Sequence, residues 1–299
     1  MERHPHARLA VIASVALCGG LASAAPRMPH DVDALMTHVG ERVAEYSRRA
    51  RNVICVERST VQPIQSNWSA DGMARTVESE LHVEFDAADG DTPPEAKMIR
   101  DVRRINGRAP RERDKKDRSG CTDPNPLSPE PLAFLLPAQR DGYLFTKVAD
   151  GKDKDRAALV IDFMSANRKS KAELIEDPRG HADCFDWAGP IAIRGRVWVD
   201  AATYDVLRVD RRLDGPVDVR VPWALQRRYS FAQWITLERD DVTMRYRAVA
   251  FTDPDEVILL PVSIESLTLL RSGLQSIRRT DTFTDYRRFL TTTRVKDPR

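Results

Sequence analysis

The feature that most constrains the fold of this chain is a two-residue alternation of apolar and polar side chains. The alternation is clearest from Arg75 to Phe85, where apolar residues fill one face and charged residues fill the other. Successive side chains of a β-strand point to opposite faces, so this pattern predicts a strand with one buried and one solvated face. The predicted buried face holds Val77, Leu81, Val83 and Phe85.

Looser alternation predicts further strands before and after this one. Segment 53–64 reads as a strand with Cys55 and Glu57 on one face, and segment 98–105 reads as another, closed by the turn-forming pair Asn106-Gly107. Two hairpins follow. The first joins 143–148 to 157–163, and the second joins 194–200 to 206–212.

Four longer strands are predicted to complete the chain as an up-and-down antiparallel meander. Their ranges are 228–238, 242–251, 257–270 and 274–290. Short turns rich in Asp, Pro, Ser and Gly are predicted between them, because these residues favour turn conformations. The turns are Asp240-Asp241, Asp253-Pro254-Asp255 and Ser272-Gly273.

Only two segments carry a helical pattern. Residues 31–51 have apolar side chains at three- and four-residue steps, which predicts an amphipathic helix with Asp31 as its N-cap. A charged, proline-rich loop is predicted near 108–131, and it leads into a short helix at 129–136 with Ser128 as its N-cap. The fold class is therefore mainly β (α+β), with an N-terminal amphipathic helix and a short internal helix.

The N-terminal residues have the three parts of a secretory signal. Arg3 and Arg8 supply the positive charge, residues 9–17 form an apolar run too short to span a bilayer, and Ala22-Ser23-Ala24 fits signal peptidase. We expect cleavage after Ala24, which leaves 25–299 as a single β-rich domain or, alternatively, two smaller ones. A rival interpretation attaches a lipid to Cys18, but Leu17 stands where such sites have a small residue.

This signal predicts a bacterial protein of the periplasm or one that is secreted. The charges predict no attraction to nucleic acid, because 47 Lys and Arg are balanced by 45 Asp and Glu. No later segment is long and apolar enough to predict a transmembrane helix.

Three cysteines follow the predicted cleavage site. In an oxidising compartment one pair can form a disulfide bond, and the pair with loop-like, proline- or glycine-flanked surroundings is Cys121 with Cys184. Cys55 lies within a predicted strand, where a packed core thiol is the expected state.

Few residues suggest catalysis, and no cofactor is predicted. His181, Asp183, Cys184 and Asp186 are metal-ligand types within six residues, but His181 is the last histidine of the chain and no second ligand pair follows. An Asp-rich turn beside a disulfide explains the same residues, so His181 and Asp183 remain weak metal candidates. The chain has no Gly-x-Ser-x-Gly nucleophile motif and no glycine-rich phosphate loop, so we expect no enzyme.

Two stretches resemble a known family. The segment Gly195-Arg-Val-Trp-Val-Asp200, followed by a turn and Val206-Leu-Arg-Val209, resembles a recurring hairpin of the periplasmic outer-membrane lipoprotein carriers and their relatives. The segment Phe283-Thr-Asp-Tyr-Arg-Arg-Phe289 is similar to a late strand of uncharacterised exported bacterial proteins with that layout. The resemblance covers about 194–295, and the proline-rich insert departs from the pattern.

The resemblance implies a curved antiparallel sheet or unclosed barrel that encloses an apolar cavity for a lipid or a lipoprotein acyl chain. The cavity candidates are Leu81, Val83, Phe85, Val197, Ile258, Leu260, Val262 and Ile264. The first functional hypothesis is thus an envelope protein that binds an apolar ligand. The alternative is a structural or interaction module of the envelope whose core is filled by its own side chains. A metal-dependent enzyme around His181 is the third.

Overall fold

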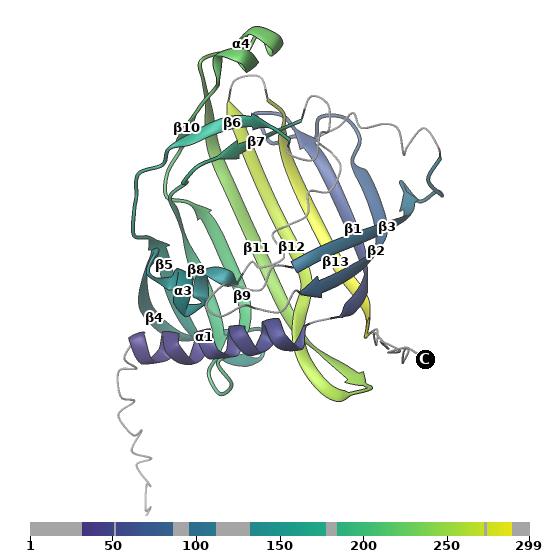
Figure 1. Cartoon of the computed structure of the whole chain (residues 1–299), viewed down its shortest axis with the longest axis vertical. Coiled ribbons are helices and arrows are strands. Elements are labelled where there is room, and N and C mark those ends of the chain that lie inside the picture. The colour runs from purple at the N-terminus through teal and green to yellow at the C-terminus, as the bar shows by residue number, and fades with distance from the viewer. Residues whose placement is uncertain are drawn as a thin grey trace, which may run out of the picture. The chain divides into compact units, whose positions relative to one another are not determined.

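The computed structural model describes residues 32–50, 52–85, 96–111, 132–177, 184–271 and 274–288. All of them belong to one compact unit, Asp31–Arg299, which is mainly β-structure (Figure 1). The helices are α1 (Val32–Arg49), the 3-10 helix η1 (Ala133–Leu135), α3 (Pro137–Arg140) and α4 (Trp223–Tyr229). The strands are β1 (Val53–Ile64), β2 (Arg75–Phe85), β3 (Ala96–Ile105), β4 (Tyr143–Asp153), β5 (Arg156–Ser165), β6 (Ala172–Glu176), β7 (Phe185–Ala188), β8 (Ile193–Asp200), β9 (Val206–Leu213), β10 (Val217–Arg220), β11 (Trp234–Thr252), β12 (Asp255–Arg271) and β13 (Ser276–Arg288).

These strands form one large sheet in the order β3-β2-β1-β13-β12-β11-β9-β8-β5-β4. Every pairing along this path is antiparallel, and β3 and β4 end it without pairing to each other among the described residues. A short branch of β10, β6 and β7 leaves β11, and its β10–β6 pairing is parallel. The expected curved antiparallel sheet that does not close into a barrel is confirmed (Figure 1).

The N-terminal amphipathic helix is also confirmed, as α1. Its buried residues recur at helical spacing and include Leu35, Met36, Val39 and Val43. Asp33 lies in the first turn and Arg48 and Arg49 lie in the last, where their charges complement the helix macrodipole. The sequence of α1 therefore specifies both the helix and the face that it buries.

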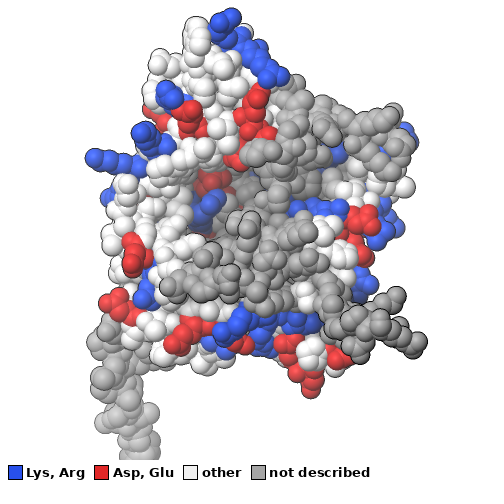
Figure 2. Space-filling view, in the orientation of Figure 1, with Lys and Arg blue, Asp and Glu red and all other residues white. Residues whose placement is uncertain are grey.

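Ion pairs attach α1 to two different strand ends. The Arg42 guanidinium donates to Asp205 Oδ1 through Nε at 2.9 Å and through Nη2 at 2.8 Å. At the other end of the helix, Arg49 donates to Glu256 Oε2 at 3.1 Å and to the Val257 carbonyl at 2.8 Å. Figure 2 shows acidic and basic side chains mixed along the lower edge of the molecule, where Figure 1 places α1.

Gly40 allows a close approach to α1. A Cβ at this position would lie 3.2 Å from the Leu135 carbonyl oxygen and 3.3 Å from Pro137 Cδ. The η1–α3 segment therefore packs against α1 where the helix has no side chain.

The predicted short internal helix is only partly described. Residues 112–131, which include most of the proline-rich loop, lie outside the described residues. Within the predicted range 129–136, Ala133–Leu135 form a 3-10 turn and Leu136 is extended, with φ −69° and ψ 146°. A separate one-turn helix, α3, then begins at Pro137, whose fixed φ suits the first helical position.

Both predicted hairpins are present, as β4–β5 and β8–β9. The carboxylate of Asp200 fixes the turn after β8, because its Oδ1 accepts hydrogen bonds from the Ala202 and Thr203 backbone N–H groups, both at 2.9 Å. Burial would raise the pKa of Asp200, but these backbone N–H groups and Arg156 outweigh burial and lower it.

The prediction of two strands at 228–238 and 242–251 is wrong. One continuous strand, β11, covers both ranges, and Asp240 lies within it rather than at a turn. The start of the first range belongs instead to helix α4, which Ser230 ends in a left-handed conformation at φ 57°. Leu225, Gln226 and Arg227 favour a helix, and Pro222 precedes its first residue.

The apolar side chains gather in three clusters. The largest, here called the α1 cluster, combines α1 and the 132–136 segment with residues from eight strands. The second combines the β6–β10 branch with β11 and α4, and the third lies at the β11–β12 hairpin end, around Phe251 and Ile258. We call the sheet face that carries the α1 cluster the inner face, and the opposite face the outer face.

Candidate functional site

Four of the predicted cavity residues lie on the inner face. Leu81, Val197 and Ile264 belong to the α1 cluster and are 4%, 0% and 5% exposed. Val83 is partly buried and packs against the same cluster. The structure thus brings together side chains from β2, β8 and β12, which are remote from one another in sequence.

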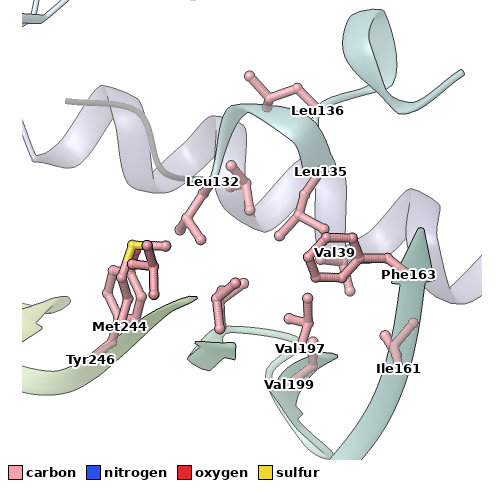
Figure 3. Packing of buried hydrophobic residues seen from close by; sticks show 14 of the residues in the cluster. Val39, Leu132, Leu135, Leu136, Ile161, Phe163, Val197, Val199, Met244 and Tyr246 are labelled. Carbon is pink, nitrogen blue, oxygen red and sulfur yellow. The ribbon is translucent and has the colours of Figure 1, made fainter. Parts of the chain in front are cut away.

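Figure 3 shows how the α1 cluster is filled. Leu135 points from its segment toward Val197 of β8 and lies beside Val39 of α1, and Leu132 lies nearer to Met244 and Tyr246 of β11. Each of Val39, Leu135, Val197 and Val199 is fully buried. All four belong to the α1 cluster, whose interior is filled by the protein's own side chains.

Ile258 and Leu260 lie apart from Ile264. They belong to the third cluster, together with Val53 and Phe251. The cause is a β-bulge, because Tyr246 pairs with Pro261 while its neighbour Arg245 pairs with Ser263, which leaves Val262 as an extra residue in β12. Val262 is half-buried. The regular alternation that would place 258, 260, 262 and 264 on one face is interrupted there.

Phe85 is the last residue of β2, and its side chain lies outside the described residues.

A row of charged side chains borders the α1 cluster on the inner face. Its first member is Glu57 of β1, which is 1% exposed. Arg100 of β3 donates to both Glu57 oxygens, at 2.5 Å and 2.8 Å. The alternating pattern predicted Glu57 on the same strand face as Cys55. It did not indicate the ion-pair partner of Glu57, because Arg100 lies 43 residues further along the chain.

Asp281 and Arg279 of β13 continue this row. Both are buried, and Arg279 Nε donates to Asp281 Oδ1 at 2.9 Å. Ser59 of β1 is paired with Asp281 across the two strands. Burial raises the pKa of Asp281, although Arg279 and Ser59 act in the opposite direction. The Asp281 carboxyl group is therefore easier to protonate than an exposed one.

Asp240 and Arg211 form the far end of the row. Arg211 Nη2 donates to Asp240 Oδ2 at 2.8 Å, and Thr268 Oγ1 donates to Asp240 Oδ1 at 3.3 Å. Burial raises the pKa of Asp240 against the opposing effect of Arg211. Arg211 Nε is buried and has no hydrogen-bond partner among the described residues.

We call these residues the inner polar row: Glu57, Ser59, Arg100, Arg211, Asp240, Arg279 and Asp281. The row lies directly beside the α1 cluster, because Asp281 pairs with Ile264 and Arg211 pairs with Val242, and both partners are cluster members. Buried ionisable groups are costly unless they are paired, and they are frequent at functional sites. The inner face thus offers apolar and charged surfaces side by side.

A small cavity lies between α1 and the sheet. Its volume is about 40 Å³, and Tyr46, Leu132, Tyr246 and Ile258 are among its lining residues. The Tyr246 hydroxyl is buried and has no hydrogen-bond partner among the described residues. Since one water molecule needs only about 10–15 Å³ of such volume, this cavity has room for water, and it is far smaller than the roughly 300–1,000 Å³ of usual ligand pockets.

The predicted disulfide falls partly outside the described residues, which do not include Cys121. Cys184 is buried, and the pairing of Cys121 with Cys184 stays a prediction. Cys55 is 1% exposed, and burial raises the pKa of its thiol to about 12. This environment suits a packed thiol and disfavours the reactive thiolate.

The weak metal candidates His181 and Asp183 also lie outside the described residues. In the part of the chain that the structure describes, no group of three or more His, Cys, Asp and Glu side chains is placed to hold a metal ion. Nor does any described helix combine the length and apolar character needed to cross a membrane.

Comparison with known proteins adds no assignment. No protein-family model matches the chain, and no curated protein matches its sequence.

Proposed function

We propose that this protein is a non-enzymatic protein of the bacterial cell envelope that binds an apolar ligand with a polar or charged group on the inner face of its sheet. A lipid or an acyl chain has this chemistry. The observation that carries the proposal is the direct contact between the α1 cluster and the inner polar row, at the pairs Asp281–Ile264 and Arg211–Val242.

The energetics of the inner face support a binding role. Burial of apolar surface contributes roughly 25 cal/mol per Å², so an apolar chain placed against the α1 cluster gains affinity from contact area alone. Buried charges such as Asp281 and Arg279 reduce stability compared with apolar residues of similar volume. A polar ligand group that forms hydrogen bonds with this row, including the Arg211 Nε, would offset that cost.

The cell-envelope location rests on the N-terminal sequence. Residues 1–31 lie outside the described residues, so the proposal uses only the order of positive charge, apolar run and Ala22-Ser23-Ala24. The resemblance of 194–295 to outer-membrane lipoprotein carriers points in the same direction.

A second function has one observation in its favour. Val39, Leu135, Val197 and Val199 are fully buried members of the α1 cluster, and the neighbouring cavity measures only about 40 Å³. A core filled by its own side chains is the property expected of a structural or interaction module. In the binding proposal, the ligand must therefore displace the 132–136 segment from the α1 cluster.

Native mass spectrometry of the full chain tests the two functions. The protein is purified from a bacterial periplasm without detergent, and its bound molecules are extracted and identified by lipid analysis. A stoichiometric lipid or fatty acid is the result that the binding proposal predicts. A ligand-free mass that is unchanged after incubation with oleate and with phosphatidylglycerol vesicles contradicts it and favours the structural module.

A matched pair of variants separates binding from stability. Ile264→Asn places a polar group in the α1 cluster, and Ile235→Asn places the same group in the second cluster, to which Ile264 does not belong. Both residues are buried in long strands, at 5% and 0% exposure, so both variants should lose several kcal/mol of stability. Only Ile264→Asn should lose the ligand. Equal ligand content in both variants would place the ligand elsewhere.

A further inference from the structure

The outer face contains a second, different pocket. The neighbouring strands β5, β8, β9 and β11 form its floor, and its volume is about 480 Å³. Met164, Arg194, Arg196, Trp198 and Arg212 contribute to its lining. This volume lies within the range of roughly 300–1,000 Å³ that is usual for small-molecule sites.

The acidic side chains of this pocket are already occupied by partners. Asp162 accepts hydrogen bonds from Arg196 Nε at 2.6 Å and from Arg196 Nη2 at 2.9 Å. Asp210 accepts one from Arg208 Nε at 2.8 Å, and Asp241 pairs with Arg239. None of these carboxylates is therefore available to balance a further cation.

Two arginine side chains of the pocket lack such a partner at close range. Arg212 has no ion pair among the described residues, and it is exposed. Arg194 Nε lies 3.9 Å from Asp214 Oδ1, while the same carboxylate accepts a shorter hydrogen bond, of 2.6 Å, from Arg168.

Arg194 and Arg212 are also directly opposite each other. They form a cross-strand pair between β8 and β9, so their Cβ atoms lie on the same face at neighbouring positions. Like charges at directly opposed positions of a sheet are destabilising. An anion between the two guanidinium groups would remove this repulsion and accept hydrogen bonds from both.

We propose that this outer-face pocket is a binding site for a small organic anion. The carboxylate or phosphate group of the ligand is held between Arg194 and Arg212, because the planar guanidinium fork matches the geometry of both groups. Met164 and the edge of the Trp198 ring contact the apolar part of the ligand. One face of the Trp198 ring is covered by Arg208, whose Cζ lies 4.4 Å from the ring centroid.

Isothermal titration calorimetry of the full chain with phenyl phosphate tests this site. Each of the variants Arg194→Gln and Arg212→Gln removes one guanidinium group and should weaken binding about tenfold or more, as expected for a charge-assisted hydrogen bond. The matched control is Arg104→Gln, since Arg104 is an exposed strand arginine whose ion pair, with Glu78, also measures 3.9 Å. Arg104→Gln changes the net charge by the same amount as the other two variants, and it should bind phenyl phosphate with the affinity of the unmodified protein.

Titration with benzoate and with inorganic phosphate identifies the group that is recognised. Tighter binding of phenyl phosphate than of benzoate assigns a phosphate site, and the reverse order assigns a carboxylate site. No measurable heat with any of the three anions overturns the proposal. An equal loss of affinity in Arg104→Gln also overturns it, because the effect is then one of net charge alone.

Thermal unfolding without added anion provides an independent readout. Arg212→Gln removes the cross-strand repulsion, so it should raise the unfolding midpoint while it reduces the further increase that phenyl phosphate causes. A lowered midpoint that phenyl phosphate raises by the full amount would contradict the proposed geometry. The Ile264→Asn variant should keep its anion affinity, so a failure of this site is distinguishable from a failure of the inner-face proposal.

Discussion

Substitution of Gly195 by Ala should destabilise the sheet at the β8–β9 hairpin. A Cβ at this position would lie 2.1 Å from the Asp210 carbonyl oxygen and 2.6 Å from Phe163 Cζ. Both distances are shorter than any contact that a real Cβ makes. The carbonyl belongs to the paired strand β9, so no side-chain rotation relieves that contact. Phe163 cannot move away easily either, because it is 2% exposed and its ring centroid lies 4.7 Å from that of Phe134.

The size of the effect follows from these contacts. Overpacking of a well-packed site typically costs about 1–3 kcal/mol. A clash with backbone places Gly195→Ala at the upper end, about 3 kcal/mol, since the two strands must separate. For a domain of this size, each kcal/mol lowers the unfolding midpoint by roughly 2–4 °C. We therefore expect a decrease of about 6–12 °C.

Urea unfolding and thermal unfolding of Gly195→Ala and Gly215→Ala measure this effect. A Cβ on Gly215 would meet no atom within 4 Å, so Gly215→Ala should change the unfolding free energy by less than about 0.5 kcal/mol. The double variant Gly195→Ala with Phe163→Leu should still be less stable than Phe163→Leu alone, because the clash with the Asp210 carbonyl remains. Equal stability of the two single variants would refute the close approach of β8 and β9.

Three further predictions concern buried polar groups. Asp200→Ala should lower the unfolding free energy by about 2–4 kcal/mol at pH 7. The lowered pKa of Asp200 means that this contribution is lost as pH falls, so urea unfolding should give a smaller deficit at pH 3. The Cys55 thiol should react with iodoacetamide at pH 8 at least about a hundredfold more slowly in the folded chain than in urea, as peptide mass mapping can measure, because burial raises its pKa. Because the pKa of Asp281 is raised in the folded chain, its carboxyl group stays protonated at pH values at which the unfolded chain has already lost this proton. The free energy of unfolding therefore falls as pH rises through the raised pKa. Asp281→Asn should lack this decline, and identical pH profiles from pH 4 to 8 would contradict the assignment.

Local patterns predicted much of the fold. The alternation in 75–85 and 53–64 identified β2 and β1, because each strand has one buried face and one face that is only partly buried. The helical spacing of Leu35, Met36, Val39 and Val43 identified α1 for the same kind of reason. Such patterns depend only on which side chains face the core, and a single sequence carries that information.

The wrong predictions concern positions whose structure is set by the strand that lies next to them. Asp240 was predicted at a turn, yet it lies inside β11, where Arg211 from β9 binds its carboxylate. The sequence does not state that β9 lies beside β11, so this ion pair could not be expected. The same applies to Val262, because a β-bulge is defined by the residues opposite it.

The candidate site was predictable in part. The alternation correctly placed Leu81 and Val197 on buried strand faces. It also placed charged residues such as Glu57 on such a face, which is a signal that could have indicated the inner polar row. The partner of Glu57 became visible only in the folded arrangement, where Arg100 is brought across from β3.

The position of β1 in the sheet has a consequence for the order in which the chain folds. β1 lies between β2, which follows it directly, and β13, which is the last described strand. As the chain is synthesised, β1, β2 and β3 can form a local three-stranded sheet early, but the other edge of β1 stays open until β13 has left the ribosome. Closing so long a loop is entropically slow, and an open strand edge invites pairing with other chains. Truncation before Ser276 would therefore leave β1 as a permanent sheet edge and make the N-terminal strands prone to aggregation.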